Sequence, residues 1–522
     1  MNFLKQTCLK LIDDIKDFAK RFPLTLSFLV LLTIVGSVQV VIEKLWLETT
    51  LAITVTTFVS LFLELCEEYE IVKFKFLKFV VCALSCIFIF LLTKAYDNVY
   101  VYTSLFGICL AITSLYFWVL YKNRPNEKLI SHLLKSLFIS NIFASVIYAG
   151  ISICLFAMYF LIYSFTDLYK IVTISAFIIE GLFFIVLFLS YIPGKDEEPE
   201  VPEIYRVIIH KGLFFTYLGL IVILYLYILK IIITWKMPVG RLNWFGCFAL
   251  LFYVFFYLTL DESDGKFQTI FKRFGGLLML PILAIQCYAI FIRVNAYGLT
   301  MARYISILLI IAAVSFIVSS IAKFNIRYCF VFASVLVLLA TCSNLNIYDV
   351  PNRMQENRLR NALSKGGALS GDKIDSDVDM EREYFEEARS AYIYLEYSFG
   401  KKSGFFNGLM TTKLGNKLGG YYPKTYIEYF HSVTMEDYDI DVSDFKTIRE
   451  VDEDCGLVSA EEIVRLAKTP EWIEAGQLNN NEPLPLYKVD SNRYIFFTLV
   501  DYSREFDGSE VELFWRGYLL TK

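Results

Sequence analysis

The chain has 522 residues, of which 56% are hydrophobic and 20% are charged, and its mean hydropathy is +0.52. This composition lies outside the range of soluble globular proteins, so most of the chain is predicted to lie in a lipid bilayer. The net charge of −4 is unevenly divided, because residues 346–522 carry 21 basic and 32 acidic side chains and the preceding residues carry a net charge of +7. A nucleic-acid partner is therefore excluded, since neither part offers a basic surface.

Residues 1–22 are predicted to form an amphipathic helix that lies in the membrane interface. Apolar side chains, among them Leu11, Ile15, Phe18 and Phe22, fall within one third of a helical wheel, and charged side chains occupy the rest. A cleavable signal peptide is not predicted, because no small-residue cleavage site follows and the next apolar run is long enough to span a bilayer.

Residues 23–345 contain eleven apolar runs of spanning length. A helix needs about 20 apolar residues to cross the hydrocarbon core. The runs are continuously apolar rather than alternating, so they are predicted to be helices and not barrel strands. They are residues 24–42, 45–63, 76–93, 99–120, 136–164, 170–192, 212–234, 244–260, 275–292, 301–321 and 326–345.

The distribution of Lys and Arg predicts the orientation. With the amino terminus in the cytoplasm, inner segments carry 20 Lys and Arg residues and outer loops carry 8. This bias favours a cytoplasmic amino terminus, and an odd number of spans then places residues 346–522 outside the cytoplasm.

Two polar side chains inside the predicted spans form a candidate intramembrane site. Glu180 lies near the middle of its run, where ionisation costs several kcal/mol without a partner or water. It is interpreted either as a proton- or cation-handling group or as a protonated carboxyl that hydrogen-bonds to a neighbouring helix. Gln286 lies in a later run, close to Pro281.

A motif between the ninth and tenth runs carries a family resemblance. Residues 292–304 read Ile-Arg-Val-Asn-Ala-Tyr-Gly-Leu-Thr-Met-Ala-Arg-Tyr, and residues 352–363 contain Gln355-x-Asn357-Arg358-Leu359. The first segment resembles the pattern R-[IV]-x-x-Y-G-L-T-x-x-R-Y, and the second is similar to Q-x-N-R-L. Both patterns occur, in this order, in an uncharacterised bacterial polytopic membrane family, domain of unknown function four-one-five-three. The resemblance implies a bacterial plasma-membrane protein with a soluble carboxy-terminal portion, and it implies no reaction.

The first motif also has a physical interpretation of its own. Gly298 permits a tight turn between two spans and Thr300 is placed to cap the second helix. Arg293 and Arg303 are predicted to lie at the outer headgroup level. They are interpreted either as structural arginines that reach lipid phosphates or as a paired-arginine site for an anionic headgroup or substrate. The candidate residues of this site are Arg293, Tyr297, Gly298, Leu299, Thr300, Arg303 and Tyr304.

Residues 346–522 are predicted to form a soluble α+β domain. Apolar residues recur at helical spacing from Met380 to Leu395, and a capping box at Ser459–Glu462 opens a second short helix. Residues 493–500 and 511–520 read as strands, with turn residues at Asp507–Gly508. Acidic runs there are interpreted as solvated surface, and no metal or cofactor is predicted.

These predictions combine into an all-α polytopic membrane domain of about 11 transmembrane helices followed by a small soluble α+β domain. The boundaries are 1–22 for the interfacial helix, 23–345 for the membrane domain and 346–522 for the extracytoplasmic domain. The favoured function is a non-enzymatic plasma-membrane anchor whose partners are the bilayer and an envelope protein or lipid. The alternative is a secondary transporter or lipid-handling permease that uses Glu180, and an enzyme with lipid-linked substrates is a third hypothesis without a catalytic motif.

Overall fold

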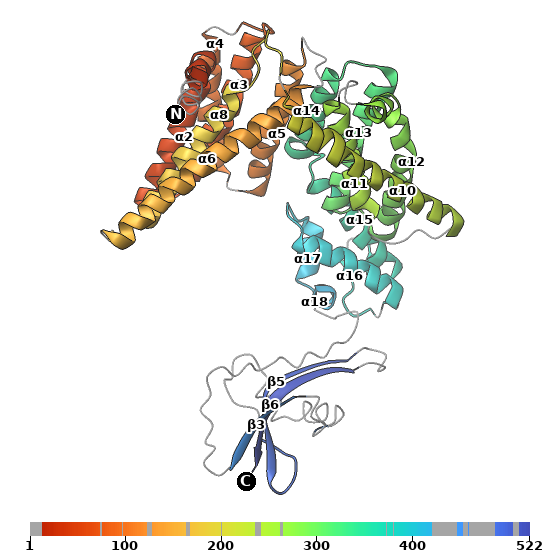
Figure 1. Ribbon diagram of the computed structural model, residues 1–522. Helices are drawn as coiled ribbons and strands as arrows, with labels where there is room; N and C mark the ends of the chain where they lie inside the picture. Colours follow the sequence, from red (N-terminus) through yellow and green to blue (C-terminus); the bar gives the residue numbers. More distant parts are fainter. Residues whose placement is uncertain are drawn as a thin grey trace. The chain divides into compact units, whose positions relative to one another are not determined.

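The computed structural model describes residues 13–73, 76–96, 98–122, 128–162, 167–199, 201–234, 242–260, 265–371, 373–378, 380–419, 446–452, 458, 486–504 and 511–521. The chain divides into two compact units, Met1–Leu418 and Gly419–Lys522. The first unit is helical and the second is built around a β-sheet (Figure 1).

Each of the eleven predicted apolar runs corresponds to a helix among the described residues. Within the described residues nine helices are long and apolar enough to cross a membrane, and two shorter apolar helices at Trp244–Thr259 and Arg327–Cys342 correspond to the remaining runs. The predicted fold class is therefore confirmed. The helices are α2 (Pro23–Ile42), α3 (Leu47–Glu68), α4 (Leu77–Ala95), α5 (Val99–Leu120), α6 (Lys128–Leu161), α7 (Leu168–Ala176) with the π-helix η1 (Phe177–Phe183) and α8 (Phe184–Ser190), α9 (Glu203–Tyr205) with η2 (Arg206–Leu213) and α10 (Phe214–Thr234), α11 (Leu242–Thr259), α12 (Lys266–Tyr297), α13 (Met301–Ala322) and α14 (Arg327–Cys342).

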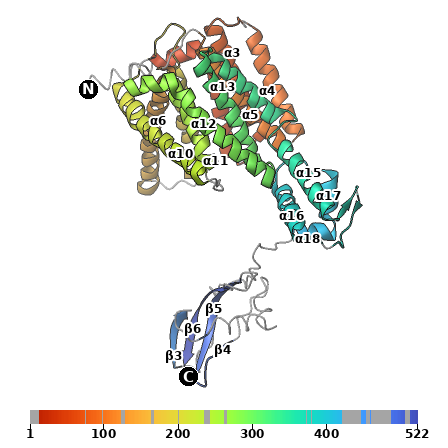
Figure 2. The same ribbon diagram turned by 90° about the vertical axis from the view of Figure 1, so that its right-hand side faces the viewer.

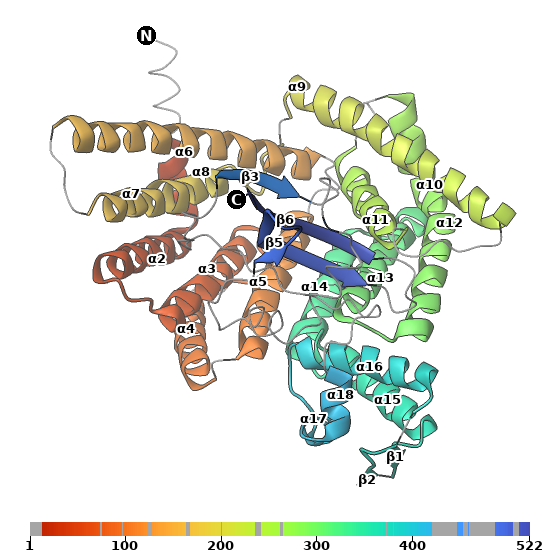
Figure 3. The same ribbon diagram turned by 90° about the horizontal axis from the view of Figure 1, so that it is seen from below.

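Large apolar side chains cover the outward faces of these helices. Phe88, Phe160, Leu229 and Phe291 are all more than half exposed. A soluble protein rarely exposes so much contiguous apolar surface, whereas hydrocarbon solvates it without cost. Buried clusters among the described residues hold the spans together. One lies among α10, α11, α12 and α13, a second joins α2, α3, α5, α6 and α8 to α11, α13 and α14, and a smaller one lies among α3, α4 and α5. Figure 3 shows the long α6 running beside α7 and α8.

The described end of the predicted amphipathic segment packs on protein. Residues 13–21 are helical, and Phe18 and Phe22 are 1% and 0% exposed. Arg21 forms an ion pair with Glu68 (2.9 Å) and donates to the carbonyl oxygen of Ile192 (2.8 Å). At this end, therefore, the apolar face is covered by the spans rather than by lipid. Residues 1–12 lie outside the described residues.

Among the described residues, four helices and a hairpin follow α14 in the first unit. They are α15 (Asp349–Lys365), β1 (Leu369–Ser370), β2 (Lys373–Ile374), α16 (Arg382–Tyr397), α17 (Gly404–Met410) and α18 (Lys413–Gly419). They surround a core that includes Leu363, Tyr392, Phe406 and Leu418, and α16 confirms the predicted helix. We call α15–α18 the juxtamembrane module. The first compact unit therefore runs on to Leu418, and α15 and α16 hydrogen-bond to the ends of spans.

The second unit contains a four-stranded antiparallel sheet in the order β3-β6-β5-β4 (Figure 2). The strands are β3 (Thr447–Asp452), β4 (Tyr487–Lys488), β5 (Arg493–Arg504) and β6 (Val511–Thr521). β5 and β6 confirm the two predicted strands, and they pair from Arg493 with Thr521 to Arg504 with Val511. The predicted capping box at 459–462 and the turn at 507–508 lie outside the described residues.

Candidate functional site

The signature motif forms the turn between α12 and α13. Gly298 follows the last residue of α12 with φ +71° and ψ 175°, and its N–H donates to the carbonyl of Val294 (2.9 Å). Only glycine adopts this backbone region readily, so the predicted turn is confirmed and explained. Thr300 stands at the N-cap of α13, but its side chain makes no capping hydrogen bond, which differs from the prediction.

The second motif binds this turn directly. The side-chain nitrogen of Gln355, on α15, donates to the carbonyls of both Tyr297 and Leu299 (3.0 Å each). Gln355 is 1% exposed, and a Cβ atom added at Gly298 would lie 2.7 Å from its Nε2 atom. The two motifs, more than fifty residues apart in the sequence, therefore meet in one buried joint, and Gly298 is required both by its backbone conformation and by the space that Gln355 occupies.

The start of α13 is capped from the juxtamembrane module. The Met301 N–H, one of the first in α13, donates to the hydroxyl oxygen of Tyr394 on α16 (3.0 Å). Burial raises the pKa of the Tyr394 phenol above its ordinary value. The Tyr304 hydroxyl donates to the carbonyl of Leu345 (2.8 Å). Tyr394 thus replaces the cap expected from Thr300.

Three arginines gather around the joint. Arg303 donates to the carbonyl of Gly298 (2.6 Å), and its guanidinium lies 5.7 Å from the centre of the Tyr297 ring. Arg293 and Arg358 lie near enough to Arg303 for their charges to interact. Arg358 donates to the Tyr297 carbonyl and pairs with Glu387 (3.2 Å). Two of the three guanidiniums therefore brace the turn, and Arg293 is the one without a hydrogen bond or ion pair among the described residues.

Glu180 and Gln286 lie in different groups of helices. Glu180 is half-buried in η1, which packs against α2 and α6, and it forms no hydrogen bond or ion pair within the described part of the chain. Gln286 is fully buried in α12 and donates to the Cys247 sulfur (3.1 Å), with Gly246 leaving room for its amide. The structure therefore does not unite them in one site.

A second intramembrane carboxylate was not anticipated from the sequence. Glu64, 3% exposed on α3, accepts from the N–H groups of Leu24 (2.8 Å) and Thr25 (3.1 Å) and from the Thr25 hydroxyl (2.7 Å). It caps the N-terminus of α2, whose own N-cap Phe22 has no capping side chain. The signal in the sequence is the polar stripe Thr57, Ser60 and Glu64. The apolar run predicted from hydropathy ends at residue 63, whereas α3 continues to Glu68.

Metal-binding chemistry receives no support from the described residues. Among them, no group of three or more His, Cys, Asp or Glu side chains is placed to hold a metal ion. In the acidic run, Asp375 accepts from the N–H of Asp377 (3.1 Å), which is the geometry of a turn.

Comparison with known protein families matches residues 26–386 to the family described as "Domain of unknown function (DUF4153)". The matched region runs from α2 into α16, so it contains the spans and the joint and stops before the second unit. No curated protein and no solved structure gives a significant match.

Proposed function

We propose that this chain, which belongs to the family described as domain of unknown function (DUF4153), is a non-enzymatic membrane anchor that holds an acidic module in water for a basic partner. The chain is an integral membrane protein with multiple spanning helices. The juxtamembrane module is fastened to the spans, and the second unit follows it in the chain.

The observation that carries this proposal is the division of charge between the two units. Residues 419–522 carry 10 basic and 21 acidic side chains, a net charge of −11, whereas residues 1–418 carry +7. Residues 346–418 carry 11 of each sign and are neutral. All of the excess negative charge after the last span therefore belongs to the separate unit. Such a charge favours fast, salt-sensitive binding to a basic surface.

We further propose a bacterial plasma membrane, a cytoplasmic amino terminus and an extracytoplasmic second unit. Among the described residues there are eleven apolar helices, nine of spanning length and two shorter, and an odd number of spans supports this orientation. The excess of Lys and Arg in the predicted inner segments supports it too. Ser491 is exposed in the second unit, and Glu198 is exposed in a predicted inner loop. In a cysteine-free background, an impermeant thiol reagent on intact cells should label Ser491→Cys, and Glu198→Cys only after lysis. The reverse pattern would contradict the orientation.

Partner binding is tested by neutralising equal numbers of charges in the two regions. One triple variant removes three negative charges from the second unit: Asp437→Asn, Asp439→Asn and Asp441→Asn. The control variant removes three negative charges from the neutral juxtamembrane module: Asp375→Asn, Asp377→Asn and Glu381→Gln. In-cell crosslinking of the full-length protein should recover several-fold less partner from the first variant, with little change in the control. Equal recovery from both variants would refute an acidic binding module.

A permease is the second candidate function, and Glu180 is the observation that favours it. A carboxylate inside a span, in a π-helix and without a protein partner among the described residues, fits a proton- or cation-handling group. Glu180→Gln should then abolish proton movement in proteoliposomes that contain the full-length protein, while Glu198→Gln should leave it intact. Unchanged proton movement, growth and abundance in Glu180→Gln would exclude this function.

A further inference from the structure

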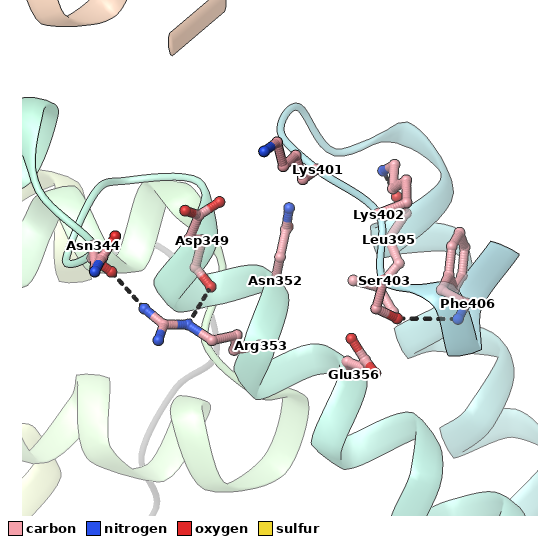
Figure 4. Close-up of a pocket in the computed structure, with 10 residues that line it drawn as sticks. All are labelled: Asn344, Asp349, Asn352, Arg353, Glu356, Leu395, Lys401, Lys402, Ser403 and Phe406. Carbon is pink, nitrogen blue, oxygen red and sulfur yellow. Dashed lines mark hydrogen bonds between the residues drawn. The ribbon is translucent and has the colours of Figure 1, made fainter. Parts of the chain in front are cut away.

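A polar pocket lies between α15 and the segment that links α16 to α17 (Figure 4). It has a volume of about 260 Å³. One lining residue, Asn344, lies two residues after the end of α14. Tyr100, the second residue of α5, contacts two other lining residues, Asp349 and Lys401. The Tyr100 hydroxyl donates to Asp349 (2.5 Å) and accepts from the N–H of Lys401 (2.7 Å). The pocket is thereby fixed to the ends of two apolar helices, α5 and α14. The end of a spanning helix is where lipid headgroups lie.

Most charged groups around the pocket already have partners. The Asp349 carboxylate accepts from the Tyr100 hydroxyl and from the Asn346 side chain (2.8 Å). Glu356 pairs with Arg360 (3.1 Å). The Lys402 ammonium donates to backbone carbonyls at the end of α16, including that of Ser398 (2.7 Å). These groups shape the pocket and have little capacity left for a ligand.

Three groups keep open hydrogen-bonding capacity. Lys401 is exposed, and its ammonium has no partner in the described part of the chain. Arg353 uses Nε and Nη2 on the carbonyls of Asp349 and Asn344, which leaves Nη1 for a ligand. Asn352 is 6% exposed and donates to the Phe399 carbonyl, but its Oδ1 atom is buried without a partner. In Figure 4 the Asn352 side chain lies between α15 and the loop that carries Lys401.

This set of groups defines the chemistry of the ligand. Two cations with free donors fit an oxyanion, and the unpartnered Oδ1 of Asn352, which lines the same pocket, fits a neighbouring hydroxyl group on the same molecule. Three cationic and two anionic side chains line the pocket, so its formal charge is +1. A singly charged phosphodiester neutralises this charge, whereas a doubly charged phosphate monoester exceeds it and meets Asp349 and Glu356.

We propose that this pocket binds the phosphodiester headgroup of a membrane lipid that carries a free hydroxyl, as phosphoglycerol does. The phosphate accepts from Lys401 and Arg353, and the hydroxyl donates to Oδ1 of Asn352. The lipid tails extend along the neighbouring spans, whose outward faces are apolar.

The experiment uses the detergent-solubilised full-length protein and measures protection from thermal unfolding by short-chain phosphatidylglycerol. Lys401→Gln removes the free ammonium and keeps the backbone bond to Tyr100, and Lys373→Gln is the matched control, because Lys373 is exposed and does not line the pocket. The apparent affinity should fall about tenfold or more in Lys401→Gln and stay unchanged in Lys373→Gln. The apparent affinity of Arg353→Gln should fall by a similar factor. Equal affinity in wild type and both pocket variants would overturn the proposal.

Two further ligands separate the possible sources of the phosphate. Phosphatidylcholine, whose headgroup lacks a hydrogen-bond donor, should protect several-fold less than phosphatidylglycerol. Inorganic phosphate and glycerol phosphate should protect at best weakly at the same concentrations. Equal protection by phosphatidylcholine would overturn the role of Asn352, and equal protection by glycerol phosphate would show a site for soluble phosphates rather than for a lipid.

Discussion

The juxtamembrane module and the second unit both follow the last span, yet they differ in how they relate to it. The module is electrically neutral and is bound to span ends through Gln355, Arg358 and Tyr394. The second unit is a compact sheet-containing body with a net charge of −11. The position of a segment after a membrane domain therefore does not make it part of a separate soluble domain. Hydrogen bonds to backbone carbonyls at the turn between α12 and α13 join the juxtamembrane module to the membrane part. The second unit differs from the module in its large net negative charge.

The largest expected effect comes from two truncations on either side of the module. Ending the chain after Leu418 removes only the second unit, so thermal unfolding of the remaining protein in detergent should be nearly unchanged. Ending it after Ile347 removes α15 and α16 and leaves the carbonyls of Tyr297 and Leu299 without Gln355. That loss should cost about 3 kcal/mol or more, from at least three hydrogen bonds of about 1 kcal/mol each. Equal stability of the two truncations would refute the joint.

A smaller effect is expected from Gly298→Ala. The added Cβ would clash with Gln355 and hold an L-residue at φ +71°, so destabilisation of about 1–3 kcal/mol is expected in detergent unfolding measurements. Gly408→Ala is the matched control, because nothing lies within 4 Å of a Cβ atom built at Gly408. If both substitutions had the same small effect, the turn would not depend on glycine.

The smallest effect is expected from Tyr100→Phe, which removes the hydroxyl that joins α5 to Asp349 and Lys401. Loss of these two hydrogen bonds should destabilise the protein by about 1–2 kcal/mol. Tyr96→Phe is the control, since Tyr96 is 59% exposed beyond the end of α4. Thermal unfolding of the two variants side by side measures the difference, and equal midpoints would mean that the module does not rely on this contact.

Within the candidate site, the sequence predicted the turn at Gly298 and the grouping of Arg293 with Arg303. It could not predict that Gln355 would meet Tyr297 and Leu299, because nothing local to either motif specifies a contact across more than fifty residues. For the same reason the cap on α13 was assigned to Thr300, the nearest suitable side chain, whereas Tyr394 on α16 accepts the Met301 N–H. Glu64 was missed because its partners, Leu24 and Thr25, lie on another helix.

The sequence by itself determined the class of the protein, the eleven apolar helices found among the described residues and the two long strands of the second unit. In hydrocarbon, each spanning segment must satisfy its own backbone hydrogen bonds. A spanning helix can therefore be predicted from the length and hydropathy of its own residues, whichever helices pack against it. Only the tertiary structure decided where the compact units divide, which motifs meet and where a polar pocket forms, since each of these depends on which helix ends come together in space.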